Sequence, residues 1–305
     1  MNGEYEQGTG ASGKAPYAIV DACVFGQIEG NPAAVVQLAE EMPTASLLRL
    51  AREMDEPVTA FVTDRAAAGA YNIRWFTRNC ELRICGHATL AASEWMLTLL
   101  GPGRSVEWHS RAGVLTADRD GDRVTVTFPE TVLHRMKPEA ADKLAATLGR
   151  RPKECLVADA DYLAVLDTPE EVMKFEPEAA AIEDLDCRGV IITARYSTPD
   201  AAKQEEYDIV SRYFAPRIAI PEDEVCVSAH CALYPYWTKR LGLRRLRAFQ
   251  ASPRGGVLEL VSHHRGRVSA TASCRVNSSG LWNVVGTVVA TQLAAVDPGL
   301  SGTLI

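Results

Sequence analysis

The sequence predicts an α+β fold of two pseudo-symmetric halves, each with a central helix wrapped by mostly antiparallel sheet. The first observation is a repeat, because residues 71–101 and 207–242 each contain a β-rich run, a polar loop with a cysteine, and a helix-like segment ending in Leu-Gly. The second is the spacing from that cysteine to the closing glycine, which is sixteen positions in both copies. The third is segment 87–100, whose apolar residues lie on nearly every helical face, as in a helix buried on most sides.

Alternating apolar residues and turn residues predict the other elements of the first half. A helix is expected at 45–54, with Thr44 as its N-cap and Leu47, Leu48 and Leu50 facing inward. Asp120-Gly121 predicts the turn of a hairpin between the last two strands. The expected strands are 17–24, 33–38, 59–62, 73–76, 106–108, 114–117 and 124–128.

The second half is predicted to repeat this order only loosely. Helices are expected at 140–148 and from Pro169 through Phe175 and onward. The mostly apolar run 282–296 is compatible with a strand or a helix, and with a sheet strand or an interface. The expected strands are 154–158, 161–166, 189–194, 209–214, 257–261 and 268–276.

These elements define the predicted domain bounds. Residues 1–15 are expected to form a disordered tail, since they lack the apolar core of a signal peptide. Residues 16–130 form the N-terminal half and 131–290 the C-terminal half. Residues 291–305 form a C-terminal tail that can pack back on the first half.

Composition excludes several classes of function. The chain has 305 residues and a net charge of −7, and its basic residues are not massed on one segment, so nucleic acid is not expected as a partner. No apolar run is long enough to span a membrane. The eight cysteines show no disulfide or zinc spacing, which indicates free thiols in a reducing cytoplasm. We expect no metal and no cofactor, because the chain lacks a phosphate-binding glycine-rich loop and clustered histidines.

The repeated cysteines, Cys85 and Cys226, each precede a predicted helix, with His87 and Ser228 two positions later as caps. Backbone N–H groups and the positive end of the helix dipole favour a bound carboxylate or a thiolate there, so a lowered thiol pKa is expected. If the two helix starts face one cleft, one thiolate can remove an α-proton while the other thiol protonates the opposite face. Most buried cysteines only fill space, and the equivalent placement of these two is what singles them out.

Several motifs resemble the phenazine-biosynthesis PhzF-like family. Gly30-Asn31-Pro32-Ala33 is similar to its G-N-P-x-A-V-V, and residues 85–91 read C-G-H-A-T-L-A as the family does. Residues 213–216 with 222–231 resemble F-A-P followed by E-D-P-V-T-G-S-A-H-C, and residues 250–256 resemble Q-x-S-x-R-G-G. The resemblance covers about residues 17–275 and implies the fold of diaminopimelate epimerase and proline racemase, often in a homodimer.

Three departures from the family pattern, in two motifs, shape the functional hypothesis. The catalytic glutamate of the family belongs to an S-E-T sequence, and Val58 stands at its position here. Glu56 is a candidate replacement, although Pro57 fixes the intervening backbone. Cys226 replaces a threonine, which matches the second cysteine of the related epimerases, and Val227 replaces a glycine that lets substrate approach the backbone.

The resemblance also implies roles for other residues. His87 would hydrogen-bond the substrate or donate a proton, and Asp223 would orient a substrate ammonium or hydroxyl group. Ser228, with the N–H groups of Ala229 and His230, would hold a carboxylate, although His230 itself is expected to pack rather than react. The remaining predicted substrate-binding positions are Asn31, Gly86 and Ala88.

Three functions remain open from the sequence. The first is a cofactor-independent racemase or epimerase of an amino acid or derived carboxylate, with Cys85 and Cys226 as acid and base. The second is a PhzF-like double-bond isomerase or cyclase in which Asp223, His87 or Glu56 replaces the missing glutamate. The third is a non-catalytic protein that binds a small carboxylate. The sequence leaves open the substrate, the stereochemical outcome, the pathway and the oligomeric state.

Overall fold

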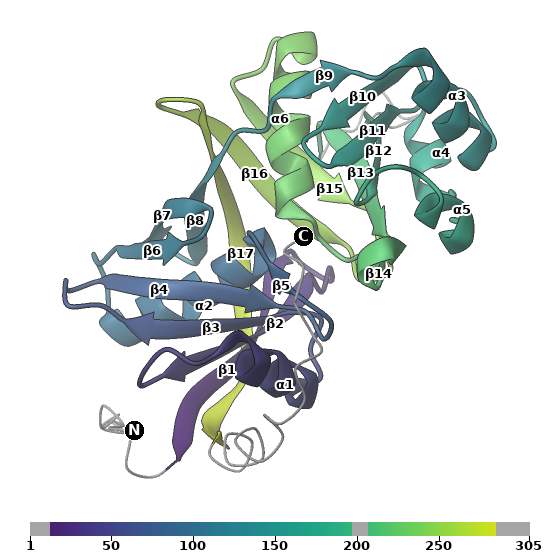
Figure 1. Ribbon diagram of the computed structural model, residues 1–305. Helices are drawn as coiled ribbons and strands as arrows, with labels where there is room; N and C mark the ends of the chain where they lie inside the picture. Colours follow the sequence, from purple (N-terminus) through teal and green to yellow (C-terminus); the bar gives the residue numbers. More distant parts are fainter. Residues whose placement is uncertain (1–12, 197–206, 285–305) are drawn as a thin grey trace, which may run out of the picture. The chain divides into compact units, whose positions relative to one another are not determined.

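The computed structural model describes residues 13–196 and 207–284, which form two compact units (Figure 1). The first unit consists of the described residues within Met1–Ala22, Pro32–Val124 and Cys274–Ile305. The second unit consists of the described residues within Cys23–Asn31 and Thr125–Ser273. These bounds differ from those expected at residues 130 and 290. The reason is that single strands, such as Lys14–Val24 and Arg267–Asn283, begin in one unit and end in the other.

The first unit contains two helices, α1 (Thr44–Met54) and α2 (Gly86–Leu100), and a mixed sheet. Strand β3 pairs in parallel with β2 and antiparallel with β4, β4 pairs in parallel with β6, and β6 pairs antiparallel with β7. The strands of this part of the chain are β1 (Lys14–Val24), β2 (Asn31–Leu38), β3 (Thr59–Asp64), β4 (Ala70–Phe76), β5 (Glu81–Leu82), β6 (Val106–Ser110), β7 (Gly113–Asp120) and β8 (Arg123–Pro129).

Helix α2 is buried on nearly all sides, as its apolar sequence predicts. Leu90, Ala91 and Ala92 are fully buried, and the helix contacts β3, β6 and β7. Ser93, also fully buried, accepts a hydrogen bond of 2.9 Å from the indole Nε1 of Trp108 on β6. Packing on nearly all sides fixes the position of this helix. Cys85 immediately precedes its first residue, Gly86, so the position of Cys85 is fixed as well.

Helix α1 covers another part of the same sheet. Leu47 and Leu50 are buried against Phe61 and Phe76, as expected, whereas Leu48 is only half-buried. The expected N-cap is wrong by one position: Pro43 is the N-cap, and Thr44 is the first helical residue. The Thr44 hydroxyl instead accepts a hydrogen bond from Arg74 on β4, so a tertiary contact occupies the oxygen that would cap the helix.

The second unit places helices on both faces of a continuous ladder of strands. The ladder runs β9, β10, β11, β12, β13, β15, β16, β17, and β11/β12 and β13/β15 are its parallel pairs. The short strand β14 pairs antiparallel with β13. The strands are β9 (Leu133–Arg135), β10 (Glu154–Ala158), β11 (Asp161–Val165), β12 (Val190–Arg195), β13 (Ile209–Ala215), β14 (Ile220–Asp223), β15 (Arg245–Gln250), β16 (Gly256–His263) and β17 (Arg267–Asn283).

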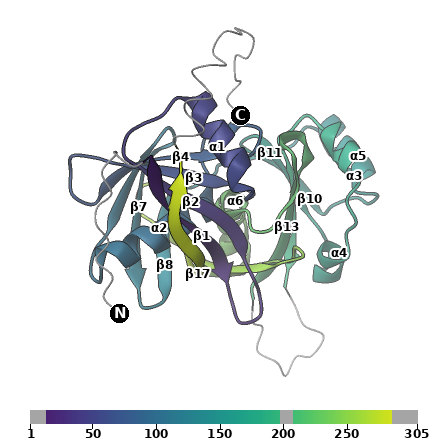
Figure 2. The ribbon, with the colours of Figure 1, turned by 90° about the horizontal axis from the view of Figure 1, so that it is seen from below.

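Alternation along β12 shows which helices cover each face of this sheet. Ile192 and Ala194 pack with residues of α3, α4 and α5, which lie together on one side of β10, β11 and β13 in both views (Figures 1 and 2). Thr193, between them, points to the other face and accepts a hydrogen bond of 3.1 Å from Trp237 on α6. The helices are α3 (Pro138–Thr147), α4 (Pro169–Met173), α5 (Ala179–Glu183), the 3₁₀ turn η1 (Pro216–Ile218) and α6 (Val227–Leu241). The single helix expected from Pro169 onward is therefore two short ones.

The two units repeat one order of elements more closely than the sequence indicates. In the first unit, β4 pairs antiparallel with a short strand, β5, and in parallel with β6, which follows α2. In the second unit, β13 pairs in the same way with β14 and with β15, which follows α6. Both central helices have 15 residues. The predicted α+β fold of two pseudo-symmetric halves is confirmed.

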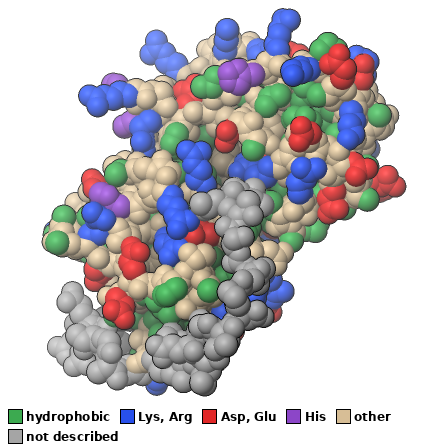
Figure 3. All heavy atoms as spheres, in the orientation of Figure 1, with side chains coloured by type: hydrophobic (Ala, Val, Ile, Leu, Met, Phe, Trp, Pro, Cys, Tyr) green, Lys and Arg blue, Asp and Glu red, His purple; other side chains and the backbone are tan. Residues whose placement is uncertain are grey.

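The described residues contain no helix that is long and apolar enough to cross a membrane. On the face drawn in Figure 3, both units carry acidic as well as basic side chains. Most of the run 282–296 lies outside the described residues, and its described beginning, Trp282-Asn283, ends strand β17.

Candidate active site

The predicted cysteines occupy equivalent positions at the starts of the two central helices. Cys85 is the N-cap of α2 and Cys226 the N-cap of α6, and both have extended backbone angles. The carbonyl of Cys85 accepts the N–H of Thr89 at 3.1 Å, and the carbonyl of Cys226 accepts the N–H of His230 at 3.2 Å. The prediction that His87 and Ser228 cap these helices is wrong, because both lie inside the first turn. Neither helix has a side-chain oxygen or nitrogen as its cap.

His87 points back to Cys85 rather than capping the helix. The Cys85 Sγ lies 3.6 Å from Nδ1 and 4.0 Å from Nε2 of His87, and both residues are buried. A thiol in contact with an imidazole can pass its proton to the ring. Gly86 and Ala88, on either side of His87, are buried in the same turn. The first turn of a helix has N–H groups with no acceptor within the helix.

Cys226 lies in a more enclosed setting. Its Sγ is 3.3 Å from the hydroxyl of Ser228 and also accepts a hydrogen bond from the backbone N–H of Ala229. Burial raises the pKa of the Cys226 thiol well above its usual value, and Asp223 and Asp161 raise it further, against the lowering contributions of Ser228 and Ala229. The prediction of a lowered pKa is wrong for this thiol, because its desolvation exceeds the effect of the helix start. Cys226 is therefore protonated at neutral pH.

Asp223 is held at the end of β14 by Asn31. The Asn31 Nδ2 donates to Asp223 Oδ1 at 2.6 Å and to the carbonyl of Val225 at 3.2 Å, so both N–H bonds of this buried amide are used within the chain. Cys23 is a further buried residue near this carboxylate, with a φ of 67°. Burial, and then Asp223, raises the pKa of Cys23 to about 12.

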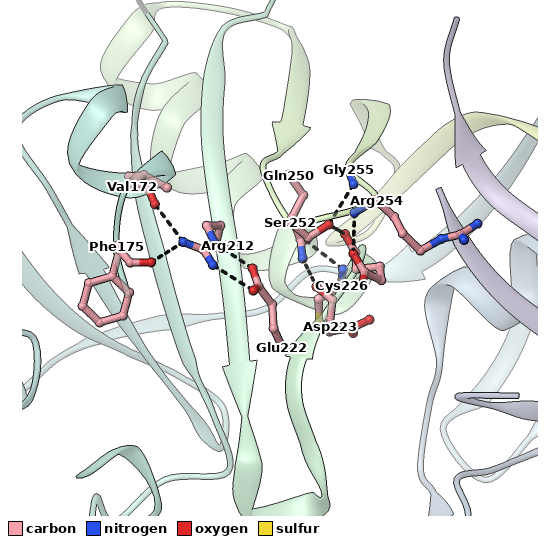
Figure 4. Close-up of polar contacts among 11 residues, drawn as sticks. Val172, Phe175, Arg212, Glu222, Asp223, Cys226, Gln250, Ser252, Arg254 and Gly255 are labelled. Carbon is pink, nitrogen blue, oxygen red and sulfur yellow. Dashed lines mark hydrogen bonds and ion pairs between the residues drawn. The ribbon is translucent and has the colours of Figure 1, made fainter. Parts of the chain in front are cut away.

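Gln250 joins the two ends of the segment that leads into α6 (Figure 4). Its Oε1 accepts the N–H of Cys226 at 2.9 Å, and its Nε2 donates to the carbonyl of Asp223. It is fully buried at the end of β15. Sequence reasoning noted the motif around Gln250 only as part of the family pattern and gave it no role. The motif itself was the signal that could have drawn attention to it.

His230 is packed in the core, as expected, with both ring nitrogens in contact. Nδ1 lies 2.8 Å from the carbonyl of Cys226, and Nε2 lies 3.2 Å from the hydroxyl of Ser211. A carbonyl only accepts, so Nδ1 carries the hydrogen and Nε2 accepts from Ser211. Burial lowers the pKa of His230 to about 4, although its contact with the Cys226 carbonyl acts in the opposite direction. The backbone N–H of His230 bonds within the helix, so the prediction that it helps to hold a carboxylate is wrong.

The second unit also contains a buried charged cluster that the sequence did not indicate. Tyr213 donates its hydroxyl to Asp161 at 3.0 Å, and Arg188 forms two hydrogen bonds to the same carboxylate. A Cβ on Gly189 would lie 2.6 Å from the Tyr213 hydroxyl, so this position requires glycine. Burial, followed by Asp161 and Cys226, raises the pKa of Tyr213, so this hydroxyl stays protonated.

The position of the missing glutamate is apolar and enclosed. Val58, which precedes β3, is 1% exposed, and its carbonyl accepts the N–H of Ala34 at 3.0 Å. Glu56 is half-buried two positions earlier. Val227, at the position of the family glycine, is also 1% exposed. Among the residues that the structure describes, no group of three or more His, Cys, Asp or Glu side chains is arranged to hold a metal ion.

The predicted site residues thus form two groups. Cys85, Gly86, His87 and Ala88 lie together in the first unit, and Asn31, Asp223, Cys226, Ser228 and Ala229 lie together in the second. The facing of the two thiols across one cleft stays a prediction.

The fold and these helix starts define a protein with the architecture of racemases and epimerases. A structure of hydroxyproline epimerase from Agrobacterium vitis, with bound trans-4-hydroxy-L-proline, is similar with a TM-score of 0.53 at 11% identity, over 89% of this chain and 91% of that one. At this identity the likeness concerns the fold alone.

Closer matches define the family. The phenazine biosynthesis-like (PhzC-PhzF) family matches residues 20–280. An uncharacterized isomerase of Pseudomonas aeruginosa is 39% identical over 79% of this chain and 88% of its own length. The crystal structure of a PhzF-family protein from Enterococcus faecalis is similar with a TM-score of 0.77 at 34% identity, over 88% of this chain and 99% of that one. The chain belongs to the phenazine biosynthesis-like family.

Proposed function

We propose that the chain is a cofactor-independent isomerase that moves a proton at the carbon next to the carboxyl group of an amino acid or a derived carboxylate. One observation carries the proposal: a thiol stands at the start of each central helix, while the position of the family's carboxylate base is the enclosed Val58. An aliphatic side chain cannot act as a general base. The relatives named as isomerases and the racemase fold support the same class of reaction.

The surroundings of the two thiols support different starting states. His87, 3.6 Å from Cys85, is placed to accept the thiol proton, which leaves Cys85 as the thiolate base. Cys226, with its raised pKa, starts as the protonated thiol. Cys85 removes the α-proton of the substrate, the electron pair stays on the carbon and its carboxylate, and Cys226 delivers its proton to the opposite face. The products are a Cys85 thiol and a Cys226 thiolate, which return to the starting state by proton exchange with solvent.

Polar groups of the same two turns suit the rest of such a substrate. The first-turn N–H groups of Gly86 and Ala88 in the first unit suit a carboxylate, and the hydroxyl of Ser228 in the second unit suits one as well. Asp223 suits an ammonium or hydroxyl group, with Asn31 fixing its orientation. Because Ala229 already donates to the Cys226 sulfur, we assign it to that sulfur rather than to the substrate.

Proton exchange in D₂O tests the proposal. The protein is incubated with a panel of free amino acids, short peptides and unsaturated or hydroxylated carboxylates, and deuterium incorporation is followed by mass spectrometry. We expect deuterium at an α-carbon, lost in both Cys85→Ser and Cys226→Ser. Cys80→Ser is the matched control, because this half-buried thiol lies between β4 and β5 and its Sγ contacts the hydroxyl of Thr77 at 3.5 Å.

The retained His87 and Asp223 favour a second candidate, a PhzF-like double-bond isomerase or cyclase with a relocated base. It predicts deuterium at a carbon conjugated to the carboxylate, and exchange that survives both cysteine substitutions. That result would overturn the two-thiol reaction. The enclosed Val58 also suits a protein that binds a small carboxylate without catalysis, which predicts saturable binding with no exchange of any substrate proton.

A further inference from the structure

The segment from Asp223 to Cys226, which joins β14 to α6, is held by side chains from two distant parts of the chain. Asn31 contacts the Asp223 carboxylate and the Val225 carbonyl. Gln250 contacts the Asp223 carbonyl and the Cys226 amide (Figure 4). Every one of these four contacts is a hydrogen bond to a buried or half-buried group, so the path of the chain into α6 is fixed from outside the helix.

Gln250 contacts both ends of this segment. A primary amide combines a donor and an acceptor on one planar group, so it sets the spacing between the carbonyl of Asp223 and the N–H of Cys226. Gln250 is fully buried, and the parallel pairing of β15 with β13 places it beside the segment. A glutamate at this position keeps the acceptor for Cys226 but, when ionised, has no donor for Asp223.

The residues after Gln250 hold the rest of the segment. The Ser252 hydroxyl donates to the carbonyl of Glu224 at 2.7 Å, and the N–H of Arg254 donates to the carboxylate of Glu224 at 2.9 Å. A Cβ on Gly256 would lie 2.0 Å from Cγ2 of Val225, so glycine is required for this close approach. The motif from Gln250 to Gly256 therefore packs along the whole segment that ends in Cys226.

We propose that Gln250 is a positioning residue that fixes the backbone amide of Cys226 relative to the carbonyl of Asp223 and so keeps the Cys226 thiol buried. The proposal rests on the proposed function in one respect, the assignment of Cys226 as the proton donor. Without the two hydrogen bonds of Gln250, the segment into α6 can shift, and the sulfur becomes more exposed to water. The Cys226 thiol then ionises more readily, so a smaller fraction of it is protonated and able to donate a proton.

The ionisable groups around this thiol come from several elements. Asp223 lies on β14, Asp161 on β11 with its partners Arg188 and Tyr213, and neutral His230 one turn into α6. Cys23 adjoins Asp223 and has its own raised pKa. None of these side chains is bonded to the side chain of Gln250, so a change at Gln250 acts on Cys226 through the backbone.

The pH dependence of Cys226 alkylation tests this role without any substrate. Purified full-length protein is treated with iodoacetamide between pH 6 and pH 10.5, and the modified Cys226 peptide is quantified by mass spectrometry. In Gln250→Met, which keeps the length of the side chain and removes both hydrogen bonds, we expect the midpoint to fall by about one pH unit or more. In Gln250→Glu, which keeps the bond to Cys226 and adds a negative charge, we expect the midpoint to rise.

Gln37→Met is the matched control, because Gln37 lies on β2 in the first unit and donates to Asp64 at 3.0 Å, and its Cys226 midpoint should equal that of the unchanged protein. A purely structural role predicts faster alkylation at every pH with an unmoved midpoint in both Gln250 variants, and that result would overturn the proposal. If Gln250→Met does not fold, Gln250→Glu still decides, since an unmoved or lowered midpoint in that variant contradicts the positioning role.

The alkylation experiment and the exchange experiment test different proposals, and either proposal can be refuted while the other is kept. A shifted midpoint without any deuterium exchange keeps the positioning role of Gln250 and removes the isomerase. Exchange that depends on both cysteines, together with an unmoved midpoint in Gln250→Met, keeps the isomerase and removes the positioning role.

Discussion

Asn31 shows how a single buried amide supports the site in the second unit. It is 1% exposed and donates to both Asp223 and the carbonyl of Val225. Asn31→Ala leaves two acceptors of this region without their donor, which costs about 1–3 kcal/mol of the free energy of unfolding. Urea denaturation measures this loss. Asn72→Ala is the control, because Asn72 bonds to Thr63 and Arg65 at a more exposed site, and its loss should be smaller. Equal losses would contradict the prediction.

The residues of the site could be predicted from the sequence in part. Asn31, Asp223, Cys226 and Ser228 were singled out by motif, and the structure brings them together in one unit. The direction of the Cys226 pKa could not be predicted, since it depends on how completely the fold removes the thiol from water. The role of Gln250 could not be predicted either, because it follows from strand pairing that the local sequence does not encode.

At the scale of elements, a buried ion pair joins β13 and β14 to the helices beside them. Arg212 forms two hydrogen bonds with Glu222, of 2.6 and 2.8 Å, and donates to the carbonyls of Phe175 and Val172 (Figure 4). Its guanidinium also lies over the ring of Phe214, 4.9 Å from the centroid. The pair therefore fixes the end of the α4 region on the sheet edge from which the Asp223 segment departs.

Glu222→Gln should destabilise the protein strongly, because it leaves a largely buried arginine without its counter-charge. Removing one partner of a buried pair costs about 3–5 kcal/mol, and the residual exposure of this pair places the expected loss at the lower end. Thermal and urea denaturation measure it. Asp167→Asn is the matched control, since the ion pair of Asp167 with Lys153 is exposed and should contribute less than about 1 kcal/mol. A loss at Glu222 no larger than at Asp167 would refute the prediction.

Helix α6 contains Pro235, which has no N–H to donate to the carbonyl of Cys231. The N–H of Thr131 occupies that carbonyl instead, at 3.4 Å, so part of the cost of an interior proline is offset. Pro235→Ala restores the helical donor and should stabilise the protein by about 1 kcal/mol, less than the roughly 3 kcal/mol of an uncompensated proline. The urea midpoint measures the change.

Pro138→Ala is the control for this substitution. Pro138 is the first residue of α3, where the missing N–H has no partner within the helix and the fixed φ suits the helix start. No stabilisation is expected there. A loss of stability in Pro235→Ala would mean that the contact of Thr131 with Cys231 contributes more than the restored helical bond.

At the scale of the whole molecule, the sequence predicts the repeat but not its extent. The equal spacing of Cys85–Gly101 and Cys226–Gly242 identifies two helices of equal length, which the structure confirms. The parallel pairs β4/β6 and β13/β15 that flank these helices could not be predicted, because pairing between strands separated by a helix depends on tertiary packing. The unit bounds differ from the expected ones for a related reason: β1 and β17 continue across them, and a strand shows no break in its sequence pattern there.

The stability of the whole chain should depend on the titration of His230. The pKa of this histidine is lowered to about 4 in the folded protein, mainly by burial, from an ordinary value of 6.5. Between these values the unfolded chain binds more protons, so stability rises with pH through this window and is fully present above it. Acidification from pH 7 to pH 5 should therefore remove about 2 kcal/mol through His230 alone.

Urea unfolding of the unchanged protein and of His230→Asn, at pH 5, 6 and 7, isolates this contribution. Asparagine can donate to the carbonyl of Cys226 as Nδ1 does, but it does not titrate. The variant should be less stable than the unchanged protein at pH 7. This difference should shrink by about 2 kcal/mol on going to pH 5, because unfolding at low pH lets His230 bind a proton, whereas asparagine binds none. Subtraction removes the other titrating groups, which both proteins share. A difference that stays constant over this range would show that His230 does not titrate on unfolding, and the neutral, Nδ1-protonated ring that supports the start of α6 would then be the wrong assignment.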